Sequence, residues 1–126
     1  MGNGKNIIIG LVAKCDFLLP FTAKIRNIEH YQATDAGYGI KISLQDRERY
    51  FDRTWQTVIL HLSGLENPVE VNVAKPSFWN RTCGELIKKE IGNWYLRGHS
   101  PRWTRGNPPT VRLKQIAERE FFVEFS

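Results

Sequence analysis

The chain has 126 residues with an ordinary globular composition, 41% hydrophobic, 12% aromatic and 25% charged, and it carries a net charge of +5. This composition excludes a disordered or fibrous chain, and the length fits a single domain over residues 1–126. No apolar run approaches the ~20 residues of a membrane-spanning helix. Lys14 stands where a lipoprotein signal needs a small residue before Cys15. We therefore expect a cytoplasmic protein without a membrane partner.

Hydrophobic patterns predict β-strands along most of the first 75 residues. The run Ile7–Val12 is apolar on both faces, as in a buried strand. Four later segments alternate or are rich in Val, Ile and Leu, namely 21–26, 38–45, 55–62 and 69–74. A turn at residues 34–37 should join the first two of these as a hairpin, with Lys24, Arg26 and Lys41 on one outer face. The balanced charges of residues 45–53 predict a solvated loop.

One amphipathic helix is predicted, near residues 83–97. Thr82 and Glu85 have the spacing of a capping box, with Thr82 as the N-cap. Apolar residues then recur every three or four positions, a stripe that would pack against the sheet: Cys83, Leu86, Ile87, Ile91, Trp94 and Tyr95.

The C-terminal part of the chain completes the predicted fold. A loop punctuated by Gly and Pro covers residues 98–109, and the alternating segments 111–114 and 121–125 should form a hairpin. The element order predicts an α+β fold, a small and mostly antiparallel β-barrel or strongly curled sheet of about six or seven strands with one helix.

The positive charge is concentrated in one segment. Residues 75–117 contain nine Lys and Arg but only two acidic residues, whereas residues 1–74 are neutral overall. Three of the four tryptophans also lie in this segment. Basic side chains attract phosphate and an exposed indole offers a face for a base, so the sequence predicts a small nucleic-acid-binding protein without catalytic activity. The choice between DNA and RNA is left open.

The predicted contacts lie on the helix, the loop and the strand that follows. Guanidinium groups bind phosphate in a bidentate manner, and the glycines of the loop allow close approach of the backbone. Trp103 has a second interpretation, in which it folds back onto the barrel. The predicted contact residues are Lys88, Lys89, Arg97, Arg102, Trp103, Arg105, Arg112 and Lys114. We expect no catalytic residue, metal or cofactor.

Two other functions are compatible with the sequence. Phe122, on the outer side of the last predicted strand, would favour a homodimer or a module for an acidic partner if that strand is an edge. A small metal-dependent nuclease would use one of two groups of acidic residues. The first group is Asp46, Glu48 and Asp52, and the second is Glu66 and Glu70 with Lys75. The first group alternates with arginines, which favours ion pairing instead.

Histidine and cysteine give no strong motif. The three histidines have no metal-ligand spacing, and His99 is the one we would test as an acid or base in RNA cleavage. Cys15 and Cys83 fit no zinc or redox motif, and a disulfide between them is left open.

Overall fold

The computed structural model describes residues 19–27, 37–100 and 102–126. In this part of the chain, seven strands form one sheet and two helices accompany it. In chain order they are β1 (Phe21–Asn27), β2 (Tyr38–Ser43), α3 (Leu44–Tyr50), β3 (Thr57–Leu62), β4 (Val69–Asn72), β5 (Cys83–Ile87), α4 (Lys89–Gly98), β6 (Thr110–Ala117) and β7 (Glu120–Phe125).

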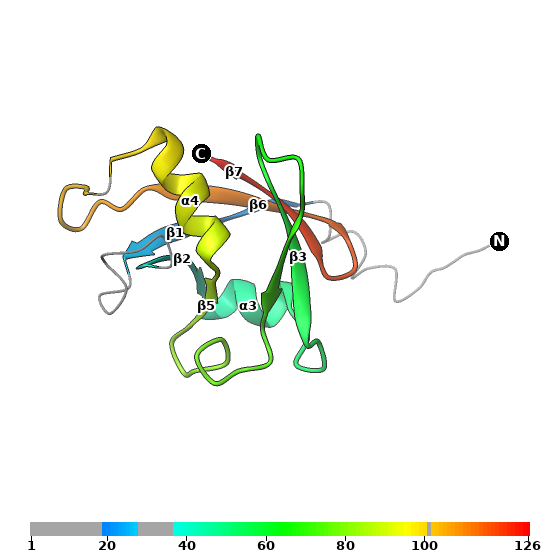
Figure 1. The fold of residues 1–126 in the computed structure, drawn as a ribbon. Coiled ribbons are helices and arrows are strands. Elements are labelled where there is room, and N and C mark those ends of the chain that lie inside the picture. Colours follow the sequence, from blue (N-terminus) through cyan, green and yellow to red (C-terminus); the bar gives the residue numbers. More distant parts are fainter. Residues whose placement is uncertain (1–18, 28–36, 101) are drawn as a thin grey trace.

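The sheet curls into a nearly closed barrel (Figure 1). Its strand order is β4-β3-β7-β6-β1-β2-β5, and each neighbouring pair is antiparallel except β3 with β7, which is parallel. The two edge strands, β4 and β5, contact each other. The predicted α+β fold with a small, mostly antiparallel barrel is confirmed.

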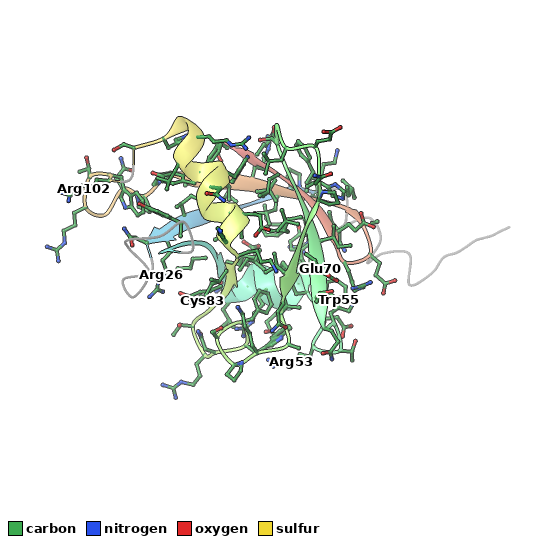
Figure 2. All side chains as sticks on the ribbon, in the orientation of Figure 1. Arg26, Arg53, Trp55, Glu70, Cys83 and Arg102 are labelled. Carbon is green, nitrogen blue, oxygen red and sulfur yellow. The ribbon has the colours of Figure 1, made fainter. Side chains whose placement is uncertain are left out.

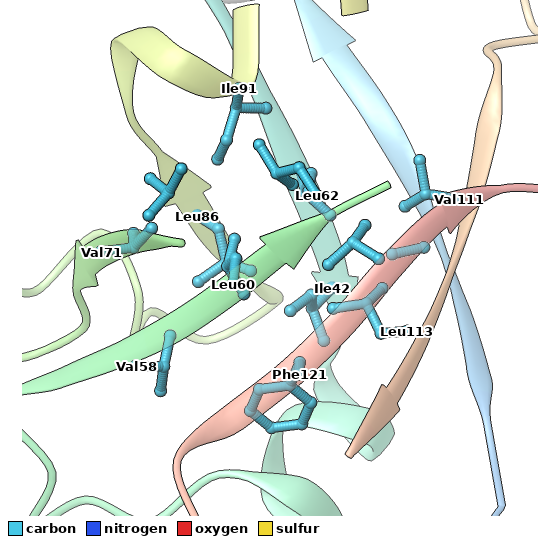
Figure 3. Close-up of a cluster of buried hydrophobic side chains, with 14 of the residues drawn as sticks. Ile42, Val58, Leu60, Leu62, Val71, Leu86, Ile91, Val111, Leu113 and Phe121 are labelled. Atoms are coloured by element: carbon cyan, nitrogen blue, oxygen red, sulfur yellow. The ribbon is translucent and has the colours of Figure 1, made fainter. Parts of the chain in front are cut away.

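Inward-facing side chains fill the barrel. Alternate residues of every strand are buried, and Figure 3 shows how Leu60, Leu113 and Phe121 meet from three strands. Ile42 of β2 joins this cluster from the opposite wall and is fully buried. Because strand side chains point alternately to the two faces, burying one set leaves the other set facing outward. This division decides which charged residues reach the outer surface.

The two helices cover opposite ends of the barrel through aromatic contacts. At one end, Tyr50 of α3 stacks on Phe21 with ring centroids 4.4 Å apart, and the adjoining Phe51 stacks on Phe121 at 4.8 Å. At the other end, Trp94 of α4 stacks on Phe125 at 4.1 Å. Phe121 and Phe125 lie near opposite ends of β7, so the helices leave the side wall of the sheet uncovered.

The predicted helix near residues 83–97 is wrong in its first half. Cys83–Ile87 forms β5 and pairs with β2, and the helix begins at Lys89. The side chain of Asn80, not Thr82, satisfies the local backbone, since it accepts from the amides of Thr82 and Cys83 at 2.9 Å. The free edge of β2 gains a partner in this arrangement, which local spacing did not reveal. The second half of the stripe, with Ile91, Trp94 and Tyr95, is buried as expected.

The predicted loop at residues 45–53 is also wrong, because Leu44–Tyr50 forms α3. Ser43 is its N-cap and accepts a hydrogen bond from the amide of Asp46 at 3.2 Å. Arg47 of this helix is buried and donates to the carbonyl oxygens of Phe78, Asn80 and Cys83. The buried side chains of this short helix are Arg47 and Tyr50, and one charged and one aromatic residue give no hydrophobic period from which to predict a helix.

Some expectations fall outside the described residues: the strand at residues 7–12, most of the turn at 34–37, and Cys15. Cys83 is described, and its thiol is free and buried. Neither helix in the described ranges has the length and apolar character needed to cross a membrane.

Candidate nucleic-acid interface

Three neighbouring strands, β6, β1 and β2, present a run of cations on the outer wall of the barrel. We call this surface the basic face, and its residues are Lys24, Arg26, Lys41, Arg112 and Lys114, all exposed. The pairing of β1 with both β2 and β6 brings them together, with Thr22 opposite Arg112 and Lys24 opposite Lys41. The other outward positions of these three strands carry no carboxylate.

The centre of the basic face is a pair of like charges. Lys24 and Lys41 are direct cross-strand partners. Like charges directly opposite each other on neighbouring strands destabilise a sheet. Among the described residues neither lysine forms an ion pair. Glu85 stands opposite Lys41 on β5, whereas the partner of Lys24 on β6 is the uncharged Thr110.

Two carboxylates border the basic face. Arg26 forms an ion pair of 2.5 Å with Glu85 of β5, which is itself the direct cross-strand partner of Lys41. Gly39, opposite Arg26 on β2, has no side chain to obstruct this diagonal contact. Arg112 pairs with Glu124 of β7 at 2.6 Å. Both arginine side chains remain about half exposed, 48% and 53%, so each keeps guanidinium surface for another ligand.

The part of the outer wall formed by β4, β3 and β7, at the other end of the strand order, has the opposite character. Its outward residues include Glu70, Glu120 and Glu124. Glu120 contacts the ring of His61 at 2.9 Å, and Glu70 accepts from Thr57. The strands β6, β1 and β2 thus carry the outward cations, whereas β4 and β7 carry outward carboxylates.

The loop before β6 continues from one end of the basic face. The amide of Ile25 donates to the carbonyl of Pro109 at 2.9 Å, which ties the end of the loop to β1. Arg102 and Arg105 are exposed, and Figure 2 shows Arg102 projecting away from the body of the molecule.

Trp103 packs against the end of the barrel, as in the second interpretation of this residue given above. Its ring centroid lies 6.4 Å from that of Tyr38 and 6.1 Å from that of Tyr95, and the side chain is half-buried. Burial raises the pKa of Tyr38, while the charge of Arg102 acts in the opposite direction. Arg102 therefore lies close enough to this aromatic group to influence its ionisation.

The other predicted contacts lie apart from the basic face. Lys88 is the N-cap of α4 and Lys89 its first residue, so they do not form a basic stripe along a helix. The charge of Lys88 acts on Lys75 instead. Burial lowers the pKa of Lys75, the negative charge of Glu85 raises this pKa, and the positive charge of Lys88 lowers it. Arg97, in the last turn of α4, lines a hollow with Glu66 and Glu90.

The structure thus joins Arg112 and Lys114 to three cations of the hairpin β1–β2 that the predicted contact set omitted. The outward alternation of Lys24, Arg26 and Lys41 is visible in the sequence. Their proximity to β6 is not, since it depends on strand order.

The edge-strand basis for a homodimer is wrong. β7 lies between β3 and β6 and its backbone is paired on both sides, so Phe122 does not sit on an edge.

The residues suggested for a nuclease form no metal cluster. Among the described residues, no group of three His, Cys, Asp or Glu side chains could hold a metal ion. Glu48 instead pairs with Arg47 and Arg53, and Asp52 accepts from Thr54. His99 stacks on the ring of Tyr95 at 5.1 Å and lies tilted against the ring of Phe125 at 4.1 Å.

Comparison of this chain with protein-family models, with curated proteins and with solved structures found no match.

Proposed function

We propose that this protein binds nucleic acid without catalysing a reaction, using the basic face and the neighbouring Arg102 and Arg105. The observation that carries the proposal is the Lys24–Lys41 pair at the centre of a three-strand surface whose outward residues include five cations and no carboxylate. This surface is exposed, and the helices cover the barrel ends instead.

The regular geometry of the sheet suits a repeating anion. Outward residues recur about every 6.6–6.8 Å along a strand, and neighbouring strands lie about 4.8 Å apart, so the cations form a lattice instead of a point site. Lysine ammonium groups act as compact charges, while the half-exposed guanidinium groups of Arg26 and Arg112 can add bidentate contacts. Binding of this kind releases counterions from the nucleic acid and weakens steeply with salt.

The test is a titration of single-stranded and duplex oligonucleotides over a range of salt concentrations, comparing the wild type with the double variant Lys24→Ala/Lys41→Ala. The wild type should bind, with log affinity falling linearly with log salt. The double variant should bind more weakly at low salt. Its slope should be shallower by about 1.4 for a single strand or about 1.8 for a duplex, if each lysine contacts one phosphate.

Arg97→Ala is the matched control, because it removes one cation from a site apart from the basic face. It should change affinity and slope much less than the double variant, and far-ultraviolet circular dichroism should show that all three proteins are folded. Absence of salt-sensitive binding by the wild type would refute the proposal. So would equal losses in Arg97→Ala and in the double variant.

A further inference from the structure

A hollow on the outer wall adjoins the cations of β6. It has a volume of about 390 Å³ and is lined by Pro20, Arg112, Lys114, Phe122 and Glu124. Phe122 is 36% exposed, which makes it one of three large hydrophobic side chains exposed in the described part of the chain. The aromatic side chain is therefore presented to solvent within a site built from charged neighbours.

The neighbours of Phe122 are arranged asymmetrically. Lys114 is its direct partner on β6, on the side of the basic face. Along β7, Phe122 stands between Glu120 and Glu124, which are engaged by His61 and Arg112. Phosphate is attracted on the Lys114 side and repelled along β7, whereas carboxylate oxygens can accept from the amino groups of a base.

We propose that the basic face takes single-stranded nucleic acid, with the phosphates over β6, β1 and β2 and a base stacked on Phe122. This inference rests on the proposed function and adds the strandedness of the ligand and the direction in which the bases point. A cationic surface with an exposed aromatic ring is the usual arrangement for single-strand binding that does not depend on sequence.

A duplex does not satisfy this site. Its bases are stacked inside the helix, so Phe122, which belongs to a continuous sheet, meets a base face only if that base is first unstacked and unpaired. In a single strand the base is already available, and every base has a face that can stack. Phe122 should therefore contribute to single-strand affinity and not to duplex affinity.

The deciding experiment compares Phe122→Ala with the wild type on a short single-stranded oligonucleotide and on its duplex, by fluorescence anisotropy at low salt. Single-strand affinity should fall about five-fold or more, which corresponds to the lower end of the effect of removing one stacking side chain. Duplex affinity should stay within two-fold of the wild type. We take a two-fold change, which corresponds to about 0.4 kcal/mol, as the threshold for no effect. The salt slope should not change, because no phosphate contact is lost.

Three further variants separate stacking from other effects. Ile116→Ala removes an exposed apolar side chain, 52% exposed, that does not line the hollow, and it should bind like the wild type. Phe122→Leu keeps apolar bulk without an aromatic face and should resemble Phe122→Ala, whereas Phe122→Trp should retain affinity and show indole quenching when oligonucleotide is added.

The possible outcomes distinguish this inference from the proposed function. If Phe122→Ala binds single strands as well as the wild type does while Lys24→Ala/Lys41→Ala binds weakly, stacking is refuted and the proposed function stands. Equal losses for single strand and duplex, or retention of affinity by Phe122→Leu, also refute stacking. If the wild type binds neither oligonucleotide, the proposed function itself fails.

Discussion

At the scale of single residues, Arg47 is a buried charged side chain that donates hydrogen bonds to three backbone carbonyl oxygens. Its side chain is only 2% exposed, and Nη1 lies 2.9, 2.7 and 2.9 Å from the carbonyl oxygens of Phe78, Asn80 and Cys83. Glu48 balances the charge at 3.0 Å. The guanidinium thus holds the segment between β4 and β5, together with the first residue of β5, against α3, because it supplies donors to their backbone carbonyls.

Replacing Arg47 by Met should destabilise the protein strongly. Three carbonyl oxygens lose their donor, so we expect the free energy of unfolding to fall by about 3 kcal/mol or more. Arg53→Met is the matched control, since Arg53 stacks on Trp79 at 4.4 Å but is 63% exposed, and it should cost about 1 kcal/mol or less. Urea denaturation followed by tryptophan fluorescence measures both; equal losses would contradict the role given to Arg47.

At the scale of elements, the position of β5 depends on a glycine. A Cβ atom at Gly84 would lie 2.9 Å from the carbonyl oxygen of Phe78 and 3.1 Å from Cδ of Arg47. The chain segment around Phe78 can approach β5 this closely only because residue 84 has no side chain.

Two glycine substitutions should therefore have opposite effects. Gly84→Ala should lower the free energy of unfolding by about 1–3 kcal/mol, because the new methyl group meets backbone that cannot move independently. Gly98→Ala, at the end of α4 with open space around it, should be neutral or stabilise by up to about 1 kcal/mol. Midpoints of chemical denaturation give the signs, and a stable Gly84→Ala protein would show that the Phe78 segment can move.

At the scale of the whole molecule, stability at alkaline pH reflects the aromatic end of the barrel near α4. Burial raises the pKa of both Tyr38 and Tyr95 above their ordinary value of 10.0, and Tyr38 raises that of Tyr95 further. The unfolded chain then loses these protons at lower pH than the folded protein, so the free energy of unfolding falls as pH rises through and above 10. The lowered pKa of Lys75 acts with the opposite sign.

The corresponding prediction compares Tyr95→Phe with the wild type between about pH 9 and pH 11. The variant loses the hydrogen bond from the Tyr95 hydroxyl to the carbonyl of Ser100, so it should start less stable, but its stability should decline less with pH. Lys75→Met should decline more steeply than the wild type. Thermal unfolding at each pH provides the slopes, and parallel curves for wild type and Tyr95→Phe would contradict the predicted sign of the tyrosine contribution.

The sequence by itself determined the features that depend on local periodicity. Alternation in residues 21–26 and 38–45 correctly placed Ile25 and Ile40 inside and Lys24 and Lys41 outside, because neighbouring strand residues point to opposite faces. The same pattern located the C-terminal hairpin, where β6 and β7 are close in the chain. These elements, with the order in which they occur, were enough to predict a small α+β barrel.

Only the tertiary structure decided which strands are neighbours and what the ambiguous segments become. Residues 83–87 form a short segment whose pattern is compatible with either a helix or a strand, and the open edge of β2 selected the strand by offering hydrogen bonds. The pairing of β1 with β6 joins residues that are 86 to 92 positions apart, a contact that no local pattern encodes. That pairing places Arg112 beside the Lys24–Lys41 pair, so the basic face is a product of strand order, whereas its individual cations can be read from the sequence.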